Sequence, residues 1–476
     1  MKKLIAIIFV AGTLAVSSCS DWLDVKSRME TSAEDLFSTQ KGFRNALTGA
    51  YIKMKGTNLY GSAMTWGTME WLSQHWQDRS QLTQYQPLKN YDYKNQYAES
   101  AMANVFQGLY DAIAAVNGIL QEIDSKKNVF AAGNYELIKG EALGLRAFFH
   151  MDVLRLFGPI PTSVSGSDLI LPYVTTVSTA IHEYSTYAEY TTLLLKDLND
   201  AEELLALVDP ILDYSIADLN PSSSQVSQIE DLYLVYRQVR MNYYAILAQK
   251  ARYYMWVGDK GNARTYANKV INAKSPNGSY MYRLGSGNDM AAQDYTLSSE
   301  HIFALDDHNL ETRAYNTFVT SETFRQMDYY YGVVYNNITT DMRRTYLWVA
   351  DPRAGGYSYM RKYVQKATNP INQIPVIRLA EMHLIVAECA ETVDEGKALF
   401  NAFLETRGVP AKPFTNIEEL HRDITKEYGR EFYGEGQYFF ACKRVNSATI
   451  ELYYSAIGPQ TYIVPLPEGE IKFTNN

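Results

Sequence analysis

The spacing of apolar residues predicts helices over most of the chain after residue 30. Apolar side chains between Thr31 and Met54 recur at intervals of three and four, the period of one helical face. Three pairs of longer segments with the same period follow. They cover residues 105–124 with 135–157, residues 187–208 with 236–257 and a continuation over 262–273, and residues 377–392 with 396–407. Each pair predicts two successive helices.

The segment 248–273 shows how such helices pair. Small residues at Ala251, Ala263 and Ala267 allow two helices to cross closely, and Gly258-Asp259 between them predicts a chain reversal. This pattern resembles a tetratricopeptide repeat, and residues 144–158 and 384–407 resemble degenerate copies. Such repeats bury their apolar faces only by stacking. We therefore expect an all-α protein with helical repeats over about 101–274 and 376–440.

Two segments lack this period, residues 56–97 and residues 275–375. The first is rich in Trp, Tyr, Gln and Asn. The second is rich in Gly, Asn, Asp, Ser and Tyr and contains a strand-like run at residues 302–305. Long irregular insertions in a regular scaffold are usually functional. We expect them to form a loop-rich ligand-binding lobe within one domain that covers residues 31–476.

The N-terminus predicts export. Lys2 and Lys3 precede an apolar run over residues 4–16, which is typical of a signal peptide and too short to span a bilayer. The sequence Val-Ser-Ser-Cys at residues 16–19 resembles the lipobox of bacterial lipoproteins, in which the cysteine carries the lipid. We therefore predict a signal peptide over residues 1–18, lipid attachment at Cys19 and a tether over residues 19–30. An ordinary signal peptide with a chance cysteine is the alternative.

Charge and cysteine content narrow the function. The formal charge is −9, which disfavours nucleic acid as a partner. Cys389 and Cys442 lie in apolar, helix-like stretches, which favours buried thiols over a disulfide. The chain has 38 tyrosines, whose rings suit the C–H faces of sugars or peptide backbones, although packing within helical repeats explains most of them.

The sequence offers little for catalysis. It contains no His-Glu-x-x-His, Gly-x-Ser-x-Gly, Walker or Cys-x-x-Cys motif. Asp306-Asp307-His308 is the nearest to a metal motif, but adjacent residues seldom bind one ion together, so we predict no metal and no cofactor. Three glutamates, Glu427, Glu431 and Glu435, share a helical face and suggest either the paired carboxylates of a glycosidase or a buried ion-pair network. Arginines and lysines nearby favour the network, and we expect a protein that is not an enzyme.

The binding signal is aromatic. Trp66, Trp71 and Trp76 recur every five residues, a spacing that fits neither a helical nor a strand face, so some of these rings are expected on loops and Trp71 in the core. A second cluster contains three consecutive tyrosines, which cannot all face inward from one short element. The predicted ligand-binding residues are Trp66, Trp76, Tyr85, Tyr329, Tyr330, Tyr331 and Trp348.

Several blocks together resemble the SusD-like (RagB/SusD) family of nutrient-binding lipoproteins of the Bacteroidetes. The blocks are Cys19–Asp24, Leu109–Leu120, Lys139–Phe149 with Leu156–Pro161, Ile374–Glu381, and Glu427–Gly436 with Lys443-Arg444. Three features depart from the family pattern: no proline follows the lipidated start, Ala441 replaces the usual aspartate before the basic pair, and the chain ends Phe-Thr-Asn-Asn. The second departure puts a salt bridge at that position in doubt.

The resemblance implies tetratricopeptide-like repeats in a right-handed superhelix with an irregular ligand lobe. It also implies a lipid-anchored protein on the outer-membrane surface that captures oligosaccharides and passes them to a SusC-like TonB-dependent transporter. Some family members take peptides, so the same fold binding peptides is one alternative. A repeat scaffold that binds only proteins is another, and a glycosidase is a distant third.

Overall fold

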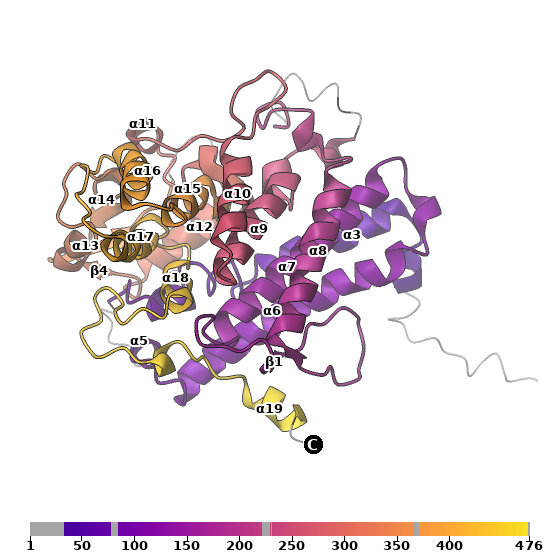
Figure 1. Ribbon diagram of the computed structural model, residues 1–476, viewed down its shortest axis with the longest axis horizontal. Helices are drawn as coiled ribbons and strands as arrows, with labels where there is room; N and C mark the ends of the chain where they lie inside the picture. The colour runs from indigo at the N-terminus through magenta and orange to yellow at the C-terminus, as the bar shows by residue number, and fades with distance from the viewer. Residues whose placement is uncertain (1–32, 78–83, 221–228, 230, 366–370, 475–476) are drawn as a thin grey trace, which may run out of the picture.

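The computed structural model describes residues 33–77, 84–220, 229, 231–365 and 371–474. The predicted signal peptide, Cys19 and the tether lie outside these residues. The described chain is mostly helical with a few small sheets, so the predicted all-α class is confirmed (Figure 1). Among the described helices, none is long and apolar enough to cross a membrane.

The N-terminal part is a stack of antiparallel helices around one central helix. Its helices are α3 (Gln40–Met54), α6 (Gln96–Ile123), α7 (Asn134–Phe157), α8 (Tyr187–Leu205), α9 (Tyr243–Trp256) and α10 (Lys260–Ile271). Helix α7 packs against α6, α8 and α9, and almost all of its residues are buried. Gly140 and Gly144 of α7 lie against Leu205 and Ile246, so a side chain at either glycine would block the close approach of α8 and α9.

Local sequence signals explain where these helices begin. Thr186 caps α8 in a reciprocal capping box with Glu189, and Asn242 caps α9 by accepting a hydrogen bond from Ala245. The predicted reversal between α9 and α10 is formed by Gly258, whose φ of +83° suits glycine. The helix expected over residues 236–257 begins later than predicted, at Tyr243, because residues 237–239 form a separate 3-10 turn.

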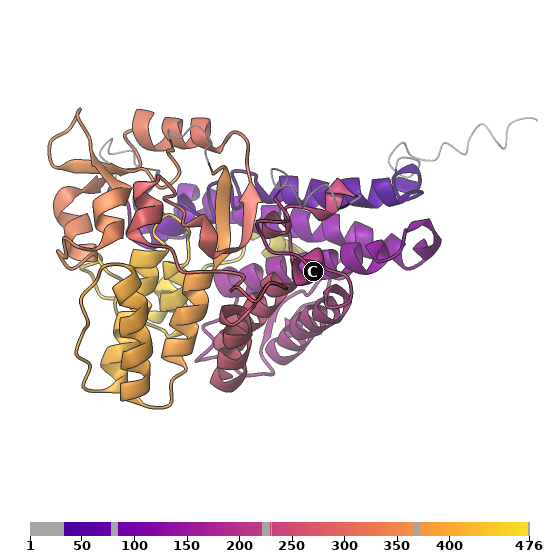
Figure 2. The same ribbon diagram turned by 90° about the horizontal axis from the view of Figure 1, so that it is seen from above.

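A second group of helices continues the stack after the irregular insertion. It comprises α15 (Leu379–Glu388), α16 (Val393–Thr406), α17 (Ile417–Glu431) and α18 (Tyr438–Arg444). Helix α10 packs directly against α15, although about a hundred residues separate them in the chain. Figure 2 shows the insertion above these orange and yellow helices, so it leaves the stack and returns to it.

The insertion and the segment before α6 contain only short elements. These are α4 (Thr68–Leu72), α5 (Gln86–Lys89), α11 (Gly287–Ala291), β3 (His301–Asp306), α12 (Leu310–Ala314), a π-helix at Tyr315–Thr320, β4 (Gln326–Met327), α13 (Asp328–Val334), α14 (Met342–Leu347), β5 (Trp348–Ala350), β6 (Tyr357–Met360) and β7 (Gln373–Arg378). Strand β3 confirms the strand expected at residues 302–305. It pairs antiparallel with β7, so Ile377 belongs to a strand and not to the helix expected from that residue.

Two further short strands, β1 (Leu169–Leu171) and β2 (Ser185–Thr186), pair in the loop that precedes α8. The chain finishes with a short helix, α19 (Glu468–Thr474). Figure 1 shows the yellow C-terminal segment running from α18 past α5 to α19, beside the N-terminal helices. Tyr93 secures it there by donating a 2.8 Å hydrogen bond to the carbonyl of Thr461.

A buried ion-pair network joins the insertion to α17. Arg378 contacts Glu300 and Glu431 at 2.8 and 2.7 Å, and Arg407 contacts the same two carboxylates at 2.7 and 2.9 Å. Arg343 pairs with Glu427 and Glu431, and Glu435 pairs with Arg378 and Lys362. The structural interpretation of Glu427, Glu431 and Glu435 is therefore confirmed, because arginines engage all three.

Other predicted structural groups also have partners. Arg146 binds Asp197 through two nitrogens at 2.6 and 2.7 Å, and Glu141 pairs with Arg237. Cys389 and Cys442 are buried free thiols, as expected. Asp307 pairs with Arg313, and the part of the chain that the structure describes contains no group of three residues that could hold a metal ion.

Candidate functional site

The aromatic residues singled out in the sequence come together in one region. Trp66, Trp76 and Tyr85 lie in the turns around α4 and α5, while Trp348 opens β5 and the three consecutive tyrosines lie on α13. Strands β4 and β5 both pair with β6, and Tyr331 on α13, which continues directly from β4, stacks on Trp348 of β5. Two segments about 250 residues apart thus share one aromatic cluster.

The tryptophans form the buried floor of this cluster. The indole N–H of Trp76 donates a 2.8 Å hydrogen bond to the carbonyl of Trp66, which holds the two turns together. The ring of Trp76 lies 6.4 Å from Trp348 and 5.4 Å from Tyr433, measured between centroids. Trp66 packs against Phe318 and Tyr363.

Three of the predicted binding residues are buried. Trp66 is 1% exposed, Trp76 0% and Trp348 7%, so none of them presents a ring face to a ligand in this structure. The physical reason is that each indole packs against aromatic side chains from distant parts of the chain, and these neighbours exclude solvent from its ring. Trp71 is buried as expected.

Two tyrosines lie on this floor with part of each ring exposed. Tyr85 stacks on Trp71 with centroids 4.6 Å apart and planes 12° apart. Tyr331 stacks on Trp348 at 5.1 Å and 4°. Phe324, also half-buried, lies 6.2 Å from Tyr85 and 5.6 Å from Trp76, and Trp76 lies 6.4 Å from Trp348, so the two stacks belong to one cluster. The stacking fixes the orientation of both phenols before any ligand arrives.

Three further tyrosines have exposed or half-buried rings, two on α13 and one in the C-terminal segment. Tyr329 is 72% exposed and lies 5.7 Å from the half-buried Tyr330. Tyr454, in the C-terminal segment, is 77% exposed. Its pKa is raised by burial and by the phenols of Tyr330 and Tyr329. We call Tyr85, Phe324, Tyr329, Tyr330, Tyr331 and Tyr454 the aromatic face.

Buried polar groups hold the segments that carry this face. Arg325 donates to the carbonyls of Phe318, Val319 and Phe324, and it pairs with Asp351 at 2.8 Å. Burial alone would raise the pKa of Asp351, but hydrogen bonds from Arg353 and Arg325 hold it well below its ordinary value. The charged carboxylate therefore fixes the guanidinium that anchors Phe324.

A second anchor lies under the tryptophan turns. The ring of His75 stacks on Tyr433 at 4.0 Å and bonds to Glu70 through Nδ1. Glu70 also accepts a 2.8 Å hydrogen bond from the backbone of Gly436, and the Tyr433 hydroxyl donates to the carbonyl of His75. These bonds tie the α17–α18 turn to the residues that precede the aromatic face.

Sequence reasoning missed three members of the cluster. Phe324 and Tyr433 gave no local signal, because each is a single ring whose tryptophan partners are distant in the chain. Tyr454 was detectable, since it follows Tyr453 in a segment without helical period, as the tyrosines of α13 do in theirs.

Comparisons with known proteins identify the family of this chain. A family model described as starch-binding and associating with the outer membrane matches residues 21–217, and a SusD family model matches residues 241–470. The chain belongs to the SusD family. No curated protein matches it closely enough to be informative.

Solved structures support the same fold. One is a SusD superfamily protein of Bacteroides thetaiotaomicron, with 20% identity, a TM-score of 0.68 and coverage of 91% of this chain and 98% of that one. Another is a SusD-like carbohydrate-binding protein of Bacteroides vulgatus, with 17% identity, a TM-score of 0.64 and coverage of 86% and 84%. A third is a laminarin-binding SusD-like protein, with 15% identity, a TM-score of 0.64 and coverage of 91% and 98%.

Proposed function

We propose that this protein captures oligosaccharides at the cell surface through the aromatic face and passes them to a TonB-dependent outer-membrane transporter of the SusC type. The single observation that carries the binding role is the pair of stacks, Tyr85 on Trp71 and Tyr331 on Trp348. A tyrosine held flat by a buried indole offers a rigid apolar surface with a hydroxyl at its edge. Such a surface suits a sugar ring, which has C–H groups on its face and hydroxyls around its rim.

The predicted roles of the original seven residues change accordingly. Tyr85, Tyr329, Tyr330 and Tyr331 remain proposed contacts, and Phe324 and Tyr454 join them. Trp66, Trp76 and Trp348 become supports that hold the contacting rings in place. Binding is expected to be weak to moderate, because a shallow exposed face orders a flexible ligand without deep burial.

Localisation and delivery belong to the same proposal. A lipid on Cys19 would hold the protein at the outer membrane, and the description of the matching family model as associating with that membrane supports this. The transporter partner is proposed from family membership. Peptides are the second ligand class to test, since an aromatic face also packs against peptide backbones.

The test is a titration with laminarin and starch oligosaccharides, followed by short peptides, using isothermal calorimetry. Tyr85→Ala, Tyr330→Ala and Tyr331→Ala should each weaken binding by roughly tenfold, as expected when a contacting aromatic is truncated. Tyr280→Ala is the matched control, because Tyr280 is 60% exposed and lies outside the aromatic face.

Unchanged affinity in all three folded variants would refute the proposed face. Binding of a peptide but of no glycan would keep the face and change the ligand class. Trp348→Ala separates contact from support: it should lower thermal stability as well as affinity, whereas Tyr330→Ala should lower affinity alone.

A further inference from the structure

A separate pocket lies where the two groups of stacked helices meet. It has a volume of about 580 Å³ and is lined by the end of α9, the start of α10, the end of α15, the middle of α17 and the residues after α18. None of its lining residues belongs to the aromatic cluster. A cavity of this size is in the range of specific ligand sites.

The charge of this pocket is opposite to that of the chain. Its ionised side chains are four cations, Lys260, Arg422, Lys426 and Arg444, against the single carboxylate of Glu388. Arg444 and Glu388 neutralise each other through two contacts of 2.6 and 2.8 Å. Among the described residues, the side chains of the other three cations form no hydrogen bond and no ion pair, although Lys260 lowers the pKa of Glu388 and Lys426 lowers that of Asp423 through charge interactions. The pocket therefore carries a net positive charge in a chain of charge −9, which favours a negatively charged ligand.

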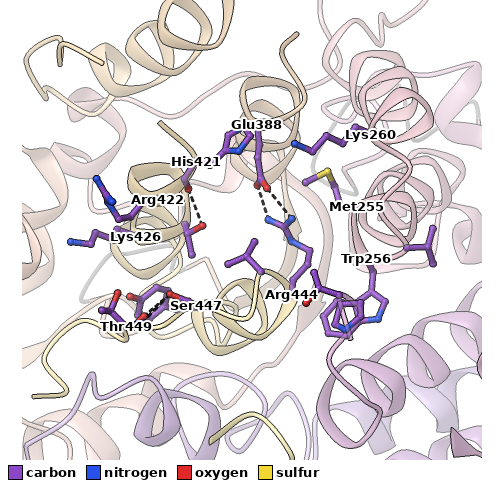
Figure 3. Close-up of a pocket in the computed structure, with 17 residues that line it drawn as sticks. Met255, Trp256, Lys260, Glu388, His421, Arg422, Lys426, Arg444, Ser447 and Thr449 are labelled. Atoms are coloured by element: carbon purple, nitrogen blue, oxygen red, sulfur yellow. Dashed lines mark hydrogen bonds and ion pairs between the residues drawn. The ribbon is translucent and has the colours of Figure 1, made fainter. Parts of the chain in front are cut away.

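The cations are distributed along the pocket. Figure 3 shows Lys260 on one side and Arg422 with Lys426 on the opposite side, with the Glu388–Arg444 pair between them. Arg422 and Lys426 are one turn apart on α17. A ligand that meets both sides must therefore be elongated and carry more than one negative charge.

The rest of the lining favours a peptide over a sugar. Apolar contacts come from Met255, Val257 and Val445, while Ser447 and Thr449 supply hydroxyls. The two large aromatic rings of the pocket, Trp256 and Tyr438, are only 3% and 1% exposed, so neither offers a sugar a ring face on which to stack. An extended backbone with alternating acidic and apolar side chains satisfies both the charge and the apolar wall.

We propose that this pocket, between α10 and α17, binds an acidic, extended peptide segment of a partner protein. The carboxylates contact Lys260 on one side and Arg422 and Lys426 on the other, and the apolar side chains lie against Met255, Val257 and Val445. The Glu388–Arg444 pair shapes the floor and is already neutral, so it does not repel the peptide.

The test uses a labelled heptapeptide of alternating glutamate and valine and a matched peptide with glutamine in place of glutamate. Binding to the full chain is followed by fluorescence anisotropy at low and at physiological salt. The acidic peptide should bind, salt should weaken it, and the glutamine peptide should bind much less. The triple variant Lys260→Gln, Arg422→Gln, Lys426→Gln should weaken binding by roughly tenfold or more.

A second triple variant, Lys41→Gln, Lys53→Gln, Lys94→Gln, makes the same charge change at exposed positions outside the pocket. It should leave affinity within about twofold. Equal weakening by both variants, or no binding of either peptide at millimolar concentration, would overturn the proposal. So would an oligogalacturonate whose binding depends on the pocket cations when the peptide's does not. Glycan binding at the aromatic face should be unchanged in the pocket variant, so the two proposals fail independently.

Discussion

At the scale of single residues, the structure divides the predicted aromatic residues into buried tryptophans and exposed or half-buried tyrosines. Seven aromatics were expected to contact ligand, and the structure brings most of them into one cluster. Their neighbours in the chain could not reveal that the indoles of Trp66 and Trp76 face inward, because partners such as Phe318 and Tyr433 lie hundreds of residues away. The argument that three consecutive tyrosines cannot all face inward predicted at least one exposed ring, and the structure shows that Tyr329 is exposed.

Arg146 provides a residue-scale test of the buried ion pairs. Arg146→Ala removes both contacts to Asp197 and leaves that carboxylate in the core beside the hydroxyl of Tyr173. Loss of one partner of a buried pair should lower the free energy of unfolding by about 3–5 kcal/mol, measured by urea denaturation. Lys196→Ala, which breaks an exposed pair with Asp200, should cost under about 1 kcal/mol. If Arg146→Ala kept full stability and only glycan affinity fell, the structural role would be wrong.

His150 should make the protein sensitive to mild acid. Burial lowers the pKa of His150 from 6.5 to about 3, and its ring bonds to Val174 and Tyr190. Between these two pKa values the unfolded chain binds the proton and the folded chain does not, so stability is full above pH 6.5 and falls as the pH drops. The free energy of unfolding should lose about 2 kcal/mol from this group between pH 7 and pH 4.5.

His150→Gln should flatten that part of the pH profile, whatever its effect on stability at pH 7. His308→Gln, at an exposed position, should leave the slope as it is in the unmodified protein. Identical slopes in His150→Gln and the unmodified protein would show that His150 is not the group responsible.

At the scale of elements, helices with a strong apolar period were predictable and short elements were not. The pattern located α7 and α8 to within a few residues, because each buries a face against neighbouring helices. The helix expected from residue 377 begins instead at Leu379, because Ile377 pairs with Phe303 in a strand. That pairing is long-range, and local periodicity carries no information about it.

The turn between α17 and α18 gives an element-scale prediction. Gly436 has a φ of +72°, and a Cβ there would lie 2.1 Å from the carbonyl oxygen of Met64. Gly436→Ala should therefore destabilise the protein by about 2 kcal/mol or more and disturb the tryptophan turns, lowering glycan affinity as well. Gly355→Ala is the control, since nothing lies within 4 Å of its Cβ position. Equal melting temperatures for the two variants would contradict this interpretation of the turn.

At the scale of the whole molecule, one helical stack is interrupted by the lobe that carries half of the aromatic cluster. The direct packing of α10 on α15 means that the scaffold fixes both ends of the insertion, and the β3–β7 pair closes it at its base. The turns around α4 and α5, which come much earlier in the chain, contribute residues to the same cluster. The aromatic face therefore depends on contacts between three distant parts of the chain, which is why composition could suggest an irregular lobe but could not indicate its surface.

The last prediction concerns how the whole protein is held at the cell. The lipobox-like residues before Cys19 predict cleavage at that cysteine and attachment of lipid, and two or more acyl chains give stable anchoring where one is marginal. Cys19→Ala should leave the protein unprocessed or release it into the soluble fraction, as measured by membrane fractionation and by mass spectrometry of the N-terminus. Cys389→Ala is the control, because that thiol is buried in the fold, and it should leave fractionation unchanged. If Cys19→Ala remained in the membrane fraction at the original level, the protein would be held there by something other than this lipid.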